Sequence, residues 1–259
     1  MAILSLTSCS GSPGVTTLAV GLALSWPRAV LLADCDPGAH QAVLAGYLTG
    51  RSASGKGLLR VAEGHRDRRP PREVVVDQCL PLTEGGGERR LFLPGFPKPT
   101  SAAHFGAVWD ELADTFDRLS EVDVDVIVDL GRIGPQGLPP ALLERSALTA
   151  VVLGSSLRSV MSARLNLPAL TYGQDARGRD RVGLVLVEEG QPYRSGEISK
   201  ALGVPVVASV PHDPAAAAHF SDGAAQTRRF ESAPLVRSLR STASTFATTL
   251  QRSTDRVRG

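Results

Sequence analysis

The segment Ser10-Gly11-Ser12-Pro13-Gly14-Val15-Thr16-Thr17 decides the fold expected of this chain. It follows the apolar run 2–8, which predicts a buried strand, and it precedes the apolar stretch 15–25, which predicts a helix. A glycine-rich turn between a strand and a helix directs backbone N–H groups and the positive end of the helix dipole toward one point. Such a point suits a phosphate group.

Short apolar runs alternate with helical patterns along the rest of the chain. Runs that are apolar on both faces are typical of a parallel sheet covered by helices. The alternation predicts an α/β fold with a doubly wound, mostly parallel sheet and helices on both faces. We expect strands at 2–8, 29–34, 73–77, 90–93, 124–129, 148–153, 182–187 and 205–210, and helices near 15–25, 39–48, 102–119, 138–146, 156–170, 195–202 and 214–220.

Acidic residues follow two of the expected strands. Asp34 and Asp36 end the run 29–34, and Asp129 ends the run 124–129. Ligands of doubly wound sheets bind at the carboxyl ends of the strands, so we expect these carboxylates to lie beside the loop 11–17. Two alternatives stay open: Asp34 and Asp36 could cap the helix expected after them, and Asp129 could stabilise a turn.

The sequence resembles the MinD/ParA family of deviant P-loop ATPases, whose loop reads Lys-Gly-Gly-x-Gly-Lys-Thr-Thr. Other segments resemble the family in its order and at about its spacing, so that the resemblance covers nearly the whole chain. They are Asp34-Cys35-Asp36-Pro37, 90–95, 125–129 and 202–213. In the loop Gly11, Gly14, Thr16 and Thr17 match, whereas Ser10, Ser12 and Val15 depart and both family lysines are missing.

The resemblance implies ATP and Mg²⁺ as ligands and assigns roles to residues of this chain. Asp36 would orient the attacking water, and Thr16, Asp34 and Asp129 would serve the metal. Pro211 and Asp213 would lie on the base side, with an ordinary turn after a strand as the alternative. The phosphates would contact Gly11, Ser12, Gly14, Val15, Thr16 and Thr17.

Two departures from the family pattern weaken the expected activity. A lysine near a phosphate oxygen contributes on the order of 4 kcal/mol of Coulomb attraction at an intermediate dielectric, whereas a backbone N–H bonded to the phosphate contributes about 1.5–3 kcal/mol. We therefore expect weak nucleotide binding and slow or absent hydrolysis. The adenine-contacting asparagine of the family is also replaced, near Val187. Arg132 could supply a substitute charge or be an ordinary solvated arginine.

The function implied by the resemblance is that of a positioning protein for a chromosome, a division septum, or a pilus or secretion apparatus. The CpaE/TadZ group of pilus assembly has atypical phosphate loops, which favours that branch by analogy. A pseudo-ATPase scaffold acting through protein contacts is the main alternative. A metabolic ATP-dependent ligase ranks last, because such enzymes keep the loop lysine. The implied partners are proteins of the positioning system, with a nucleotide-dependent homodimer and non-specific DNA contact left open.

Composition sets the remaining expectations. The chain has 259 residues, is 42% hydrophobic and carries a formal net charge of +2, so we expect one domain over 1–259 and no overall attraction to nucleic acid. We expect a cytoplasmic location, because the three cysteines form no metal pattern and no signal peptide or membrane-length run is apparent. An amphipathic helix near 234–251 is expected to dock onto the domain rather than bind a membrane. Its apolar stripe is Leu235, Val236, Leu239, Ala243, Phe246 and Leu250.

Overall fold

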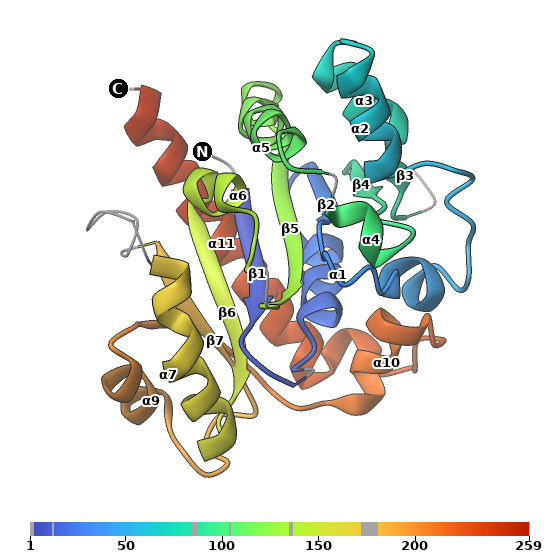
Figure 1. Cartoon of the computed structure of the whole chain (residues 1–259). Coiled ribbons are helices and arrows are strands. Elements are labelled where there is room, and N and C mark those ends of the chain that lie inside the picture. The colour runs from blue at the N-terminus through green and yellow to red at the C-terminus, as the bar shows by residue number, and fades with distance from the viewer. Residues whose placement is uncertain are drawn as a thin grey trace.

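One eight-stranded sheet forms the centre of the computed structural model, which describes residues 3–11, 13–83, 88–103, 105–134, 137–171 and 181–258 (Figure 1). The strand order is β3-β4-β2-β5-β1-β6-β7-β8, and in the described residues only β3 runs antiparallel to its neighbour. The doubly wound, mostly parallel α/β fold is therefore confirmed. The strands are β1 (Ile3–Ser8), β2 (Val30–Asp34), β3 (Leu80–Pro81), β4 (Arg90–Leu93), β5 (Asp125–Arg132), β6 (Leu148–Gly154), β7 (Val182–Val187) and β8 (Val206–Val210).

Helices cover both faces of this sheet, and each face has its own apolar core. One face carries α1 (Val15–Ser25), α10 (Pro214–Asp222) and α11 (Pro234–Arg258). The other carries α2 (Leu58–Arg66), α3 (Pro71–Gln78), α5 (Val108–Arg118), α6 (Pro140–Arg145), α7 (Leu157–Thr171) and α9 (Ser195–Leu202). Shorter elements are η1 (Val43–Tyr47), α4 (Pro99–Ala102), η2 (Leu119–Val122) and η3 (Phe230–Ser232).

Helix α1 is buried between the sheet and α11. Every residue from Leu18 to Ala23 is buried, so this helix has no polar face, as expected of a helix covered on both sides. A Cβ atom added at Gly21 would lie 2.7 Å from Cδ1 of Leu239 in α11. Glycine at this position therefore allows the two helices to approach closely, which fixes where α1 begins.

The apolar stripe predicted for the C-terminal segment is buried at all six positions, from Leu235 to Leu250. Along this stripe the helix packs into the core that also holds α1, and it continues to Arg258 rather than ending near residue 251. None of the helices in the described residues is both long and apolar enough to cross a membrane.

A buried polar contact joins the end of α1 to the start of β5. Asp125 accepts a hydrogen bond from Nε1 of Trp26 at 2.7 Å and forms an ion pair with Nε of Arg28 at 2.7 Å. Burial raises the pKa of Asp125, while the hydrogen bonds from Arg28 and Trp26 oppose that shift. The contact fixes the amino end of β5, the strand that also carries Asp129.

Three local expectations are wrong. Residues 73–77 form part of α3, because Pro71 occupies its first turn and the face holding Val74 and Val75 is buried. The helix expected at 39–48 is the π-helix η1, where a Cβ at Gly46 would lie 1.8 Å from the Ser221 carbonyl oxygen. The expected helix 102–119 is divided into α4 and α5.

Truncating Leu239 to alanine should lower the free energy of unfolding by about 2–5 kcal/mol, because a fully buried leucine leaves a cavity. Gly21→Ala should destabilise the wild-type chain through its contact with Leu239 but cost much less in the Leu239→Ala background. Urea denaturation of the two single variants and the double variant measures this coupling. Equal costs of Gly21→Ala in both backgrounds would show that the two helices do not meet at this contact.

Candidate functional site

The loop between β1 and α1 has the backbone shape of an anion-binding turn. Gly11 and Gly14 have φ angles of +66° and +88°, in the left-handed region that favours glycine. Gly14 caps α1 without a side-chain hydrogen bond, and its carbonyl accepts from the N–H of Leu18 at 2.8 Å. The N–H groups of the first turn of α1 are therefore available to a ligand. Ser12, predicted to contact phosphate, lies outside the described residues.

Asp34 and Asp129 are direct partners across the parallel strands β2 and β5, and only 6% and 2% of their surfaces are exposed. Asp36 lies beside them, because a Cβ added at Gly131 would be 2.3 Å from the Asp36 Cγ. The Thr16 hydroxyl lies close to the Asp129 carboxyl group and acts to lower its pKa, against the larger raising effect of burial. The structure thus brings together the four residues predicted for the metal and the water, at the carboxyl edge of the sheet.

The acidic side chains accept hydrogen bonds from their own loops rather than from a helix end. Asp34 Oδ1 accepts from the N–H of Asp36 at 3.2 Å, and Asp36 Oδ1 accepts from the N–H of Gly38 at 2.8 Å. Oδ2 of Asp36 lies 2.7 Å from Nδ1 of His40. The alternative that Asp34 and Asp36 cap the following helix is therefore wrong. Asp129 accepts from the N–H of Gly131 at 2.9 Å within β5, at a register shift, and the strand continues to Arg132 rather than ending in a turn after Asp129.

Burial and mutual repulsion make this acidic cluster unusual. Burial raises the pKa of Asp34 to about 8, and the charges of Asp129 and Asp36 add to the shift. Burial also raises the pKa of Asp129 to about 6, against the lowering effect of hydrogen bonds from Thr16 and Gly131. With a pKa of about 8, the buried Asp34 carboxyl group consequently retains its proton near neutral pH.

These residues fit Mg²⁺ only with help from water and phosphate oxygens. Over the described ranges, no three His, Cys, Asp or Glu side chains are gathered so as to hold a metal ion. Thr16 and Asp129 are nonetheless oxygen donors in contact at the mouth of the loop. Mg²⁺ commonly keeps several waters and binds one or two carboxylates together with substrate phosphates, so this set is sufficient for it.

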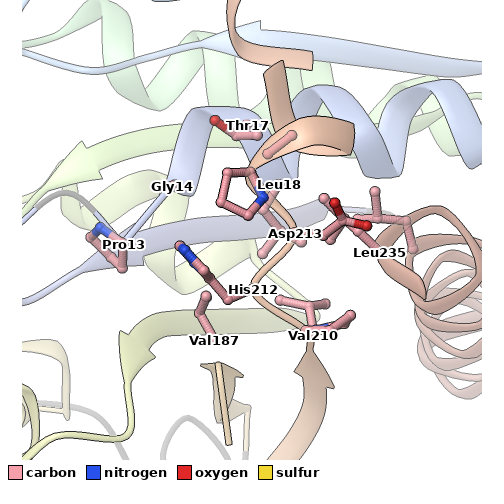
Figure 2. A pocket seen from close by; sticks show the side chains of 13 residues that line it. Pro13, Gly14, Thr17, Leu18, Val187, Val210, His212, Asp213 and Leu235 are labelled. Carbon is pink, nitrogen blue, oxygen red and sulfur yellow. The ribbon is translucent and has the colours of Figure 1, made fainter. Parts of the chain in front are cut away.

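A cavity of about 250 Å³ opens beside the loop (Figure 2). Pro211 and Asp213, predicted for the base side, line it together with Val187. Asp213 also caps α10, since its Oδ1 accepts from the N–H of Ala216 at 3.1 Å, so the turn alternative for this residue is correct too. The remaining lining residues are mostly apolar: Pro13, Gly14, Thr17, Leu18, Val210, His212, Pro214, Ala217, Leu235 and Leu239. Sequence analysis did not single out His212.

Lysine and arginine are absent from the described residues that line this cavity. Val15 is buried in the apolar core around α1. Arg132 is exposed at the end of β5 and does not line the cavity. A phosphate in this loop would be bound through backbone N–H groups and the helix dipole, which can hold a ground-state anion. They supply less of the additional charge stabilisation that phosphoryl transfer requires.

Comparisons with known proteins agree with this geometry at the level of the fold. No protein-family model and no curated protein matches the chain. A solved structure of a ParA family ATPase from Chlorobium tepidum TLS matches with a TM-score of 0.71 and 17% identity, covering 93% of this chain and 98% of that one. The fold is that of ParA and MinD ATPases.

Two MinD structures extend the likeness. The MinD cell division protein of Aquifex aeolicus has a TM-score of 0.69 and 17% identity, covering 94% of this chain and 95% of its own, and its MinC:MinD complex also matches. The septum site-determining protein MinD of Pyrococcus horikoshii OT3, complexed with Mg-ADP, has a TM-score of 0.60 and 18% identity, covering 99% and 97%. At these identities the likeness establishes a ParA/MinD fold.

Replacing Asp34 by asparagine should stabilise the fold, and increasingly so as pH rises. The pKa of Asp34 is about 8 in the folded state and lies near 4 in an unfolded chain, so between these values the folded state binds more protons. The contribution of this group to stability therefore falls as pH rises through that window. We expect the variant to gain about 1–3 kcal/mol in free energy of unfolding near pH 8 and little near pH 4.

Urea denaturation at both pH values, without Mg²⁺ or nucleotide, measures this effect. Asparagine keeps the oxygen that accepts from the Asp36 N–H, so the hydrogen bond should survive. Glu121→Gln, a change at an exposed carboxylate, is the matched control and should show no such trend. If the variant gained more free energy of unfolding near pH 4 than near pH 8, the buried, protonated state of Asp34 would be contradicted.

Proposed function

We propose that this chain is a nucleotide-binding positioning protein of the MinD/ParA family in which ATP hydrolysis is weak or absent. One observation carries the proposal: the loop of Gly11 and Gly14 faces Thr16 and Asp129 and opens into a cavity whose described lining has no lysine or arginine. The backbone geometry favours binding of phosphate. Without lysine or arginine in the described lining, the site offers little stabilisation of the charge that develops during phosphoryl transfer.

ATP with Mg²⁺ is the proposed ligand, supported by the Mg-ADP in the similarly folded MinD of Pyrococcus horikoshii. Backbone N–H groups of the loop would hold the phosphates. Thr16 and Asp129, with Asp34 behind them, would serve Mg²⁺, which supplies charge neutralisation when bound. Asp36 would orient a water. The proposed phosphate and base contacts are Gly11, Ser12, Gly14, Val15, Thr16 and Thr17, with Pro211 and Asp213 at the base.

The proposed process is positioning of a chromosome, a septum, or a pilus or secretion apparatus in the cytoplasm. Structural neighbours named for cell division and plasmid partition support this class of process. Protein partners are proposed by analogy with the MinC:MinD complex. A nucleotide-dependent homodimer and non-specific DNA contact belong to the same proposal, and the CpaE/TadZ branch is favoured by the lost lysines. The buried stripe of α11 argues against membrane contact through this helix.

The second candidate is a pseudo-ATPase scaffold that acts through protein contacts alone. The burial of Val15 favours it, because the position that would carry the loop lysine is part of the apolar core. No feature of the described cavity lining supports a metabolic ligase. Calorimetric titration with Mg-ATP, combined with a phosphate-release assay, separates the two candidates. Binding with slow turnover supports the positioning ATPase, whereas binding without turnover, or no binding, supports the scaffold.

Val15→Lys should increase nucleotide affinity, because an ammonium group that reaches the loop restores attraction to the phosphates. Allowing for desolvation of the lysine, we expect the dissociation constant for Mg-ADP to fall by about tenfold. Val15→Met has a side chain of similar length without charge and is the matched control. Circular dichroism first establishes that both variants are folded. An equal dissociation constant for the two variants would count against the phosphate-loop assignment.

Asp36→Ala should leave the measured ATPase rate unchanged, because a site without lysines has little transition-state stabilisation to lose. The same phosphate-release assay tests this, with the wild-type chain and the exposed-site variant Asp110→Ala measured in parallel. A fall of tenfold or more in Asp36→Ala alone would show that the site is catalytically competent and that our account of the missing lysines is wrong.

A further inference from the structure

His212 occupies a distinctive place in the cavity. It follows Pro211 in the connection from β8 to α10, and among the described lining residues it is the one side chain that can carry a positive charge. In Figure 2 its ring reaches from this connection toward Pro13 and Gly14, across the opening of the loop. A proton on this ring would therefore add a cation on the side of the cavity that faces the phosphate loop.

The surroundings of His212 leave such a charge free for a ligand. The cavity is lined from the loop, α1, β7, β8, α10 and α11, and apart from His212 the charged lining residue in the described chain is Asp213. The Asp213 carboxylate already accepts a hydrogen bond from the N–H of Ala216 as the cap of α10. No basic side chain among the described lining residues repels a protonated imidazole. Most of the wall is apolar, so little competes for its hydrogen bonds.

The loop itself lacks the cations that would otherwise perform this role. Ser10 and Val15 stand where lysines would be, and Val15 is buried in the core. We propose that protonated His212 supplies the positive charge that binds the phosphates of a nucleoside diphosphate or triphosphate, so that the site holds this ligand more tightly in mild acid than in mild base. This inference rests on the proposed function, since it requires that the cavity takes a nucleotide.

Imidazole suits such a role because its charge changes between about pH 5 and 8. A charge-assisted hydrogen bond to phosphate is roughly twice as strong as a neutral one, and here it would form at the mouth of an apolar cavity. His212 is exposed, so solvent screening limits the gain. We expect binding of Mg-ADP about fivefold tighter near pH 6 than near pH 8.

The experiment measures the dissociation constant of Mg-ADP at both pH values for four full-length chains. They are wild type, His212→Gln, His212→Arg and the control His65→Gln, whose imidazole lies in α2 beside Glu111. Titration of the ligand itself is common to all four, so the comparison between chains isolates His212. We expect His212→Gln to bind at both pH values with the weak affinity of the wild type near pH 8. His212→Arg should bind tightly at both, and His65→Gln should follow the wild type.

The outcomes separate this inference from the function on which it rests. If no chain, including His212→Arg, binds Mg-ADP at either pH, the proposed function fails and the inference fails with it. If the wild type binds but His212→Gln shows the same affinities and the same pH dependence, His212 is not the cation and only the inference fails. A loss of binding in His212→Gln without rescue by arginine would mean that histidine acts through shape rather than charge, which also overturns the inference.

Discussion

The burial of helix α1 between the sheet and helix α11 is the constraint on which the site depends. An apolar helix covered on both sides can lie in few orientations, and the close approach of Gly21 to Leu239 selects one. Its first turn is thereby held at the carboxyl edge of the sheet, where Thr16 meets Asp129. Packing on the far side of α1 therefore bears on the geometry at the loop, and α11 also supplies Leu235 and Leu239 to the cavity lining.

The same packing explains why valine at position 15 is compatible with the fold. Position 15 begins α1 and directs its side chain into the core, so valine contributes buried apolar surface where a lysine would have to reach back to the loop. Valine carries no positive charge, so it cannot offset the negative charge of Asp34 and Asp129. Asp34 and Asp129 face each other across β2 and β5 with few positive charges nearby, and their raised pKa values follow from burial and this imbalance. The site is therefore rich in acidic side chains, and its described cavity lining holds no lysine or arginine.

Sequence patterns predicted the features that depend on local periodicity. Helix α1 and strand β7 begin and end where expected, and the convergence of Asp34, Asp36 and Asp129 followed from the rule for parallel sheets. Features set by tertiary contact could not be predicted. The valines at 74–76 are typical of a strand, yet they lie in a helix because one face is buried against α2 and α5. The place of His212 in the cavity could not be predicted from the sequence, because only the folded chain brings Pro13 and Gly14 opposite this histidine.

The segment that follows Asp36 and helix α10 both border the site, and they pack against each other. The chain leaving Asp36 enters η1, where a Cβ at Gly46 would lie 1.8 Å from the Ser221 carbonyl oxygen in α10. A Cβ at Gly223 would likewise lie 2.5 Å from Cγ2 of Thr49, so glycine is required on both sides of this contact. The other end of α10 carries Asp213 and lines the cavity. Because packed interiors transmit displacement rather than absorb it, a shift of the Asp36 segment must move α10 or break this contact. The acidic cluster and the wall that bears His212 are therefore connected through the contacts at Gly46 and Gly223, which lie outside the cavity lining.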